Sequence, residues 1–229
     1  MVKPQPNRVV LDESRPVTYY KNDFWREENA RYSEVHYRLD KCARIVNRIA
    51  GERECNLLDV GCGPATLARL LRPNIHYYGI DIAIQEPAAN LAEVDILDSP
   101  IGFNDLRFEI VVAQGLFEYL GEHQSEKLAE IARVLRPRGT FVTSYVNFGH
   151  RQPTVYWPYS NVQTIDEFRS SLSKDFVVRN WFATSHNWHH NEPNRRFIRL
   201  ANMHLNLRIP VVTSKLAVEY FFVCTPRSS

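Results

Sequence analysis

Two hydrophobic spacings alternate along most of the chain, and each predicts one kind of element. Short apolar runs without a helical period are typical of buried strands, whereas apolar residues three and four apart indicate one face of a helix. The predicted strands cover residues 56–60, 76–82, 92–96, 108–114, 139–147, 176–183 and 216–224. The predicted helices cover about 22–50, 65–72, 125–136 and 164–174.

Local signals refine three of these elements. Ser125 and Thr164 each stand at the start of an amphipathic run, where a hydroxyl can accept a free N–H group of the first helical turn. Between the second and third predicted strands, the segment 83–90 is short and contains Pro87. We therefore expect a weak or reduced crossover helix there.

Strands that alternate with helices predict a Rossmann-like α/β fold, in which a mostly parallel sheet has helices on both faces. The last two strands are long, and about thirty residues separate them. We expect seven strands in total, with an antiparallel hairpin at the sheet edge. The prediction is one domain over 1–229: an N-terminal arm and helical lid (1–50), a ligand-binding core (51–150), and an acceptor-side helix, insertion and closing strands (151–229).

Composition narrows the class of protein. The chain has 229 residues, of which 44% are hydrophobic and 24% charged, and its net charge is +2. This size and composition suit one soluble domain, and the charge does not favour nucleic acid or membranes. No apolar run has the length of a membrane span or the form of a signal peptide. The four cysteines are scattered without a CxxC pair, so we expect no disulfide framework and a cytoplasmic location.

The first predicted strand runs directly into two glycines in "LLDVGCGPATLARLL", Leu57–Leu71. Ligands of open parallel sheets bind at the carboxyl ends of the strands. Glycine lets a ligand approach the backbone closely and tolerates positive φ, so Gly61 and Gly63 indicate a ligand site. The alternative is a tight strand-to-helix turn without a ligand.

Two more strand ends carry carboxylates. Asp81 ends the second strand, 22 residues after Asp59, and a carboxylate at that place can accept hydrogen bonds from both hydroxyls of a ribose. Asp95 ends the third strand, where the edge of a base would lie. Each acid alone is more often a solvated loop residue or a helix cap, but three consecutive strand ends favour a nucleotide-like ligand.

The pattern D-x-G-x-G-x-A, from Asp59 to Ala65, resembles motif I of the class I S-adenosylmethionine-dependent methyltransferases. Thr66 occupies the position where a dinucleotide-binding fingerprint needs glycine, which disfavours an NAD-linked oxidoreductase. "YYGIDI", "AEVDILD", "FEIVVAQGLFEYL" and "LAEIARVLRPRGTFVTS" resemble later motifs of the same family, from Leu57 to Val146. Three departures are Ala65 and Arg138 in place of glycines, and "FEY" in place of the common "leH".

The resemblance implies S-adenosylmethionine as the cofactor and assigns roles at each strand end. The loop Gly61–Cys62–Gly63 would contact the methionine moiety, with Asp59 holding the loop and the amino group. Asp81 would bind the ribose. The other implied cofactor contacts are Ile82 beside the adenine, Asp95 and Ile96 at the adenine edge, and Gln114 at the sulfonium end.

An acceptor hydroxyl must lose its proton during methyl transfer, so a base is useful. Glu118 and Tyr119 follow the fourth strand, although Glu118 can equally be a helix-starting acid. His150 follows the fifth strand and is the leading histidine. The histidines of "SHNWHH" (185–190) lack a carboxylate ligand and a known metal spacing, so we expect no metal site.

The predicted function is methyl transfer to a hydroxyl, or an amine, of a small molecule in natural-product, sugar or lipid biosynthesis. Aromatic residues in the N-terminal helix could cover such an acceptor or pack on the sheet. The basic amphipathic stretch within 185–211 leaves open a core helix, a homodimer contact or a membrane contact, the last not favoured. The alternatives are an RNA or protein methyltransferase of the same fold and a non-catalytic, cofactor-binding interaction subunit.

Overall fold

The computed structural model describes residues 32–35, 37–147, 162–186 and 217–227. Within these ranges one seven-stranded sheet has the order β3-β2-β1-β4-β5-β7-β6. Its strands are β1 (Cys55–Val60), β2 (Ile75–Asp81), β3 (Leu91–Glu93), β4 (Phe108–Ala113), β5 (Leu135–Val146), β6 (Phe176–His186) and β7 (Ala217–Pro226). The helices are α3 (Tyr37–Ala50), α4 (Gln124–Val134) and α5 (Ile165–Asp175), with short 3-10 turns η2 (Thr66–Leu70), η3 (Phe117–Tyr119) and η4 (Gly121–His123).

Strands β1 to β5 run parallel to one another, and β7 runs antiparallel to both β5 and β6. The predicted fold class is confirmed, including the antiparallel pair at the sheet edge: β6 is the edge strand, and β7 lies between β6 and β5. Phe221 and Phe222 explain this order, because both are 0% exposed although they point to opposite faces. A strand that is apolar on both faces is most stable with neighbours on both sides.

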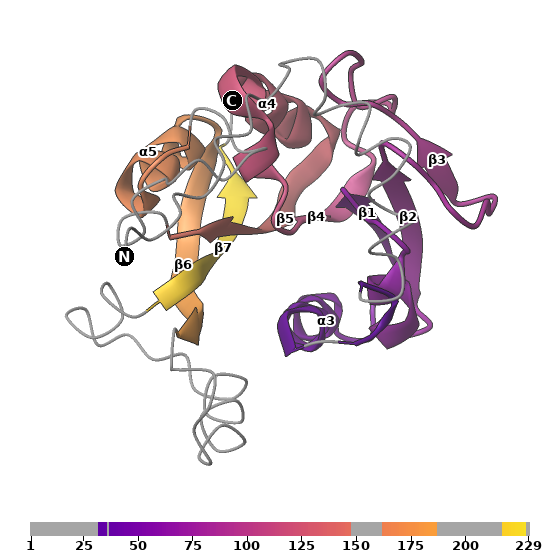
Figure 1. Ribbon diagram of the computed structural model, residues 1–229. Coiled ribbons are helices and arrows are strands. Elements are labelled where there is room, and N and C mark those ends of the chain that lie inside the picture. Colours follow the sequence, from indigo (N-terminus) through magenta and orange to yellow (C-terminus); the bar gives the residue numbers. More distant parts are fainter. Residues whose placement is uncertain (1–31, 36, 148–161, 187–216, 228–229) are drawn as a thin grey trace, which may run out of the picture.

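Helices cover both faces of the sheet (Figure 1). One core cluster joins α4 and α5 to one face through Leu128, Ile131 and Phe168. The other cluster joins α3 and η2 to the opposite face through Val46 and Leu67. The carboxyl ends of β1, β2 and β4 therefore open between two packed layers, as expected for a ligand site in an open parallel sheet.

Three local predictions were wrong. Residues 65–72 form the 3-10 turn η2 instead of an α-helix, because Ala65 has φ 52° and Pro73 follows too closely for a regular helix to develop. Helix α4 begins at Gln124 and has no side-chain cap, so Ser125 lies within it. Strand β5 begins at Leu135, immediately after α4, and not at residue 139.

The segment between β2 and β3 has no helix, which confirms the expectation for this crossover. No helix in the described ranges combines the length and the apolar composition that crossing a bilayer requires.

Thr164 caps the start of α5, as predicted, and the structure adds a complete capping box with Glu167. Its Oγ1 accepts the N–H of Glu167 at 3.2 Å, and Glu167 Oε2 accepts the N–H of Thr164 at 2.7 Å. Thr164→Ala should lower the free energy of unfolding by about 1 kcal/mol, measured by chemical denaturation. Thr164→Ser keeps the hydroxyl and should retain most of the stability; an equal loss in both variants would contradict this role of the side chain.

Candidate functional site

The turn after β1 is held against the end of β2. Gly61 and Gly63 have φ 75° and 53°, in the left-handed region that favours glycine. The N–H groups of Gly61 and Cys62 both donate to the carbonyl of Ile80, at 2.8 and 3.1 Å. A Cβ atom on Gly61 would lie 3.1 Å from Leu116 Cδ1, so this turn also packs closely against the loop after β4. The glycine turn therefore connects three neighbouring strand ends.

Asp81 completes this junction from the last position of β2. The side chain is buried, and its Oδ2 accepts the N–H of Gly63 at 2.8 Å. Its backbone carbonyl accepts the N–H of Val94, just after β3, at 2.7 Å. One residue thus links the turn after β1 to the segment after β3, the two places that the resemblance assigns to opposite ends of the cofactor.

Asp59 lies one layer beneath the turn. It is 5% exposed, and its Oδ2 accepts a hydrogen bond from the hydroxyl of Tyr77 at 2.9 Å. Burial and, to a lesser extent, the nearby charge of Asp81 raise the pKa of Asp59 to about 7, although the Tyr77 hydrogen bond opposes the shift. The carboxyl group is therefore neutral at acid pH and ionises near neutral pH, and a nearby positive charge would favour its ionised form.

The segment after β3 is also ordered by a carboxylate. Asp95 is half-buried, and its Oδ1 accepts the N–H of Leu97 at 3.1 Å. Ile96 is 8% exposed and packs in the core cluster with α4, so its backbone is the part that can face a ligand. Ile82, after β2, is half-buried.

Between β4 and η4, two buried polar atoms have no hydrogen bonds to the described residues. The first is Gln114 Nε2, whose side chain lies against the thiol of Cys42, a weak acceptor. The second is Glu118 Oε2; the other carboxylate oxygen, Oε1, accepts the N–H of Val146 at 2.6 Å. Buried polar atoms are nearly always paired, so these two atoms are available to pair with a bound group.

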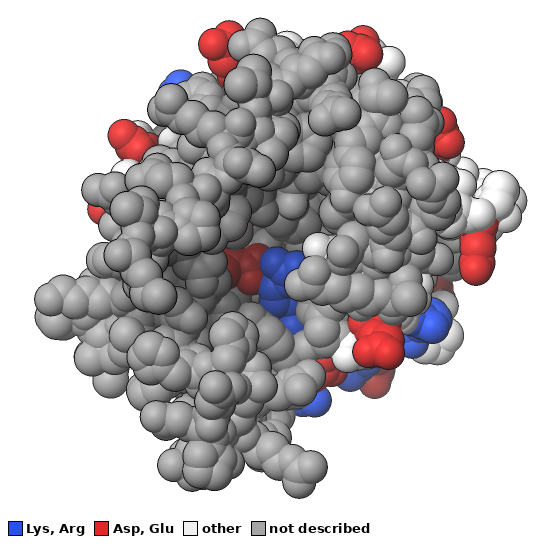
Figure 2. Space-filling view, viewed as in Figure 1, with Lys and Arg blue, Asp and Glu red and all other residues white. Residues whose placement is uncertain are grey.

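Glu118 has a second buried carboxyl nearby. Glu219, at the start of β7, is 2% exposed and forms an ion pair with Arg38 of α3 at 3.1 Å. Burial, helped by the charge of Glu219, raises the pKa of Glu118 to about 7. The N–H groups of Glu118 itself and of Val146, and the charge of Arg38, oppose this rise. Figure 2 shows acidic and basic side chains of described residues next to each other near the centre of the face in view.

Sequence reasoning missed Arg38 and Glu219. The available signal was the acid in "LAVEYFFVC", because Glu219 is a single charge within an otherwise apolar strand. Of the other predicted bases, Tyr119 is half-buried in η3, and His150 lies outside the described residues. Also outside them are His189, His190, the first part of the predicted N-terminal helix (22–31) and nearly all of the stretch 185–211. His186 ends β6, and its side chain is not described.

Over residues 35–184, the sequence matches the model of a family described as a methyltransferase domain. This span covers well over half of the chain. The chain belongs to this methyltransferase family. The search of curated proteins finds no match for the sequence.

Solved structures share the methyltransferase fold. A SAM-dependent methyltransferase from Archaeoglobus fulgidus has a TM-score of 0.61 and 18% identity, over 89% of this chain and 99% of that one. The complex of the Trm112 methyltransferase activator and a methyltransferase from Haloferax volcanii has a TM-score of 0.64 and 16% identity, over 91% of this chain and 98% of that one. The N-methyltransferase NodS from Bradyrhizobium japonicum, solved with S-adenosylhomocysteine, has a TM-score of 0.56 and 12% identity, over 94% of this chain and 97% of that one. At these identities the likeness shows the fold alone.

S-adenosylmethionine is the cofactor of this methyltransferase, as the sequence resemblance predicted. The site fits it. The glycine turn exposes backbone where a side chain would intrude, Asp81 offers a carboxylate at the end of β2, and the buried orphan atoms of Gln114 and Glu118 follow β4. When bound, S-adenosylmethionine supplies an electrophilic methyl group on a positively charged sulfur.

The raised pKa of Asp59 predicts a pH dependence of stability. A carboxyl group whose pKa is higher in the folded than in the unfolded protein makes the folded state bind more protons between the two values. The stability of the cofactor-free protein should therefore fall as pH rises from about 4 to about 7. Asp59→Asn should remove a part of this fall on the order of 3 kcal/mol, because the amide oxygen still accepts from Tyr77 and carries no charge.

Chemical denaturation at a series of pH values measures this effect, with the exposed Asp98→Asn as a control for the change of net charge. The raised pKa of Glu118 also makes stability fall as pH rises. The Asp59→Asn variant should therefore flatten the dependence of stability on pH only in part. A profile identical to that of the wild type would contradict the raised pKa of Asp59.

Proposed function

We propose that this protein transfers the methyl group of S-adenosylmethionine to a hydroxyl, or an amine, of a small molecule. The observation that carries the proposal is the setting of Glu118. Its carboxylate is fully buried after β4 and anchored to the end of β5 through Val146, and one oxygen has no hydrogen bond from the described residues. A base held in this way suits a small acceptor that enters a closed site.

Glu118 would take the proton that a hydroxyl acceptor loses. A bond forms between the acceptor oxygen and the methyl carbon, and the carbon–sulfur bond breaks with its electron pair remaining on sulfur. A carboxyl group with a pKa of about 7 is well matched to general-base work near neutral pH. The transfer also consumes one positive and one negative charge together, so the buried site gains no net charge during the reaction.

The cofactor contacts of the proposal follow the strand ends. The Gly61–Cys62–Gly63 turn and Asp59 would hold the methionine part, and Asp81 the ribose. The adenine would lie between Ile82 and the Asp95–Ile96 segment, and Gln114 would face the sulfonium. The hydrogen bond from Gly63 to Asp81 supports this assignment, because it holds the carboxylate that would bind the ribose next to the glycine turn.

Replacing Asp81 should weaken cofactor binding in a protein that still folds. Asp81→Asn removes a charge-assisted acceptor for the ribose hydroxyls, so we expect affinity for S-adenosylhomocysteine to fall about tenfold or more. Isothermal titration calorimetry of the wild type and the variant measures this change. The exposed Asp98→Asn is the matched control and should bind normally. Absence of sulfur-ligand binding in the folded wild type would overturn the proposed function.

Replacing Glu118 should impair transfer much more than binding. Glu118→Gln keeps an oxygen to accept the N–H of Val146 but removes the base, so we expect turnover to fall about 100-fold or more. The wild-type kcat/KM should rise with pH through about 7, as Glu118 loses its proton, and the variant should lack this rise. The assay follows labelled methyl transfer from S-adenosylmethionine to a panel of hydroxyl and amine acceptors.

The exposed Glu122→Gln in η4 controls for loss of a nearby acid and should leave turnover unchanged. The acceptor panel includes RNA and a protein extract, so that transfer only to these would overturn the small-molecule assignment. If Glu118→Gln turns over an acceptor as fast as the wild type does, Glu118 is not the general base.

A further inference from the structure

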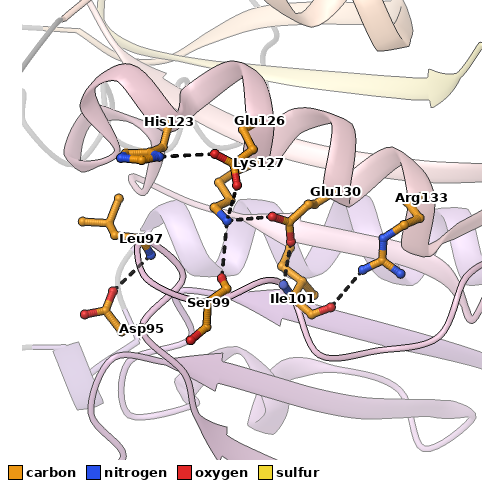
Figure 3. A network of polar contacts seen from close by, with 9 residues as sticks. All are labelled: Asp95, Leu97, Ser99, Ile101, His123, Glu126, Lys127, Glu130 and Arg133. Atoms are coloured by element: carbon orange, nitrogen blue, oxygen red, sulfur yellow. Dashed lines mark hydrogen bonds and ion pairs between the residues drawn. The ribbon is translucent and has the colours of Figure 1, made fainter.

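The segment between β3 and β4 is held by helix α4, although it has no helix of its own (Figure 3). Lys127 of α4 is 2% exposed, and its Nζ donates to the carbonyl of Ser99 at 3.3 Å. The same ammonium group contacts Glu126 at 2.9 Å and Glu130 at 2.6 Å. A buried cation thus has both of its ion-pair partners on its own helix and directs its remaining donor to the segment.

Two further residues of α4 hold the next part of the segment. Glu130 Oε2 accepts the N–H of Ile101 at 2.6 Å, and Arg133 Nη2 donates to the carbonyl of Ile101 at 2.9 Å. Arg133 Nη1 also donates to the carbonyl of Phe103 at 2.8 Å. Lys127, Glu130 and Arg133 are spaced three residues apart, so they lie along one side of the helix. We call these three residues the α4 clamp.

The α4 clamp is connected to Asp95 through the backbone. Ser99, whose carbonyl Lys127 contacts, donates its own N–H to the carbonyl of Asp95 at 2.9 Å. Within the described part of the chain, Asp95 Oδ2 accepts no hydrogen bond, while Oδ1 accepts that of Leu97. One carboxylate oxygen is therefore used to shape the loop, and the other is available to a ligand.

Stability alone is a weak reason for such a network. Buried ion pairs recover little more than their desolvation penalty, and apolar residues of similar volume often stabilise a protein as well or better. The clamp does something that an apolar contact does not: its hydrogen bonds to Ser99, Ile101 and Phe103 fix the position of the backbone along the helix. A fixed backbone is what a site needs when its ligand contacts come from a loop without secondary structure.

We propose that Lys127, Glu130 and Arg133 are positioning residues that hold Asp95 at the adenine edge and thereby set the selectivity of this methyltransferase for adenine. The inference rests on the proposed cofactor site. Asp95 accepts from the 6-amino group of adenine, whereas a base with a 6-oxo group presents an acceptor to the same carboxylate and is rejected. The clamp acts through Asp95 and does not touch the base.

The experiment compares the dissociation constants of S-adenosylhomocysteine and its inosine analogue, which has a 6-oxo group, by titration calorimetry. The wild type should prefer the adenine compound by about tenfold. Lys127→Met keeps the length of the side chain but removes the donor, and it should reduce this preference to about twofold. Asp95→Asn should reduce it equally, and the double variant should show no further reduction, because both changes remove one interaction.

Arg44→Met, which breaks an exposed ion pair with Asp40 on α3, is the matched control and should keep the full preference. Arg133→Lys is a second clamp variant for use if Lys127→Met does not fold; it keeps the charge but cannot bond the carbonyls of Ile101 and Phe103 together. An unchanged preference in a folded clamp variant, or in Asp95→Asn, would overturn the inference. A folded wild type that binds neither compound would instead overturn the proposed function.

Discussion

The hydrogen bond from the Gly63 N–H to the Asp81 carboxylate is the interaction on which the site depends. It joins the turn after β1 to the end of β2, and the backbone of Asp81 continues the connection to Val94. The positive φ of Gly63 lets its N–H turn toward that carboxylate. A side chain on Gly61 would also crowd Leu116, so the same turn controls its distance from the loop after β4.

Features set by neighbouring residues could be predicted from the sequence. The seven strands, the N-terminal cap at Thr164 and the weak crossover before β3 all depend on short-range patterns, and the structure has each of them. The glycine turn and Asp81 could be recognised in the sequence, because their residue types suit only a few backbone geometries and ligand contacts. These local signals predicted the family from residues within one continuous part of the chain.

Features set by distant residues could not be predicted in the same way. The place of β7 inside the sheet depends on pairing with strands far away in the chain, and the Arg38–Glu219 ion pair joins residues 181 positions apart. Helix η2 differs for another reason: its composition favours an α-helix, but the fixed positions of Ala65 and Pro73 leave too little room. The α4 clamp was missed because charges on a helix usually face solvent.

The protonation of the two buried acids, Asp59 and Glu118, depends on whether a positively charged ligand is bound in the site. Asp59 and Glu118 both have pKa values of about 7, because burial penalises their ionised forms. Under the proposed function, the positive charge of the cofactor would lower these pKa values, so its binding would release protons. Under the proposed function, transfer leaves a neutral thioether and a protonated Glu118, which is the charge state that burial favours. The product complex therefore lacks the ion pairing that helped to hold the substrate complex, and this difference favours product release.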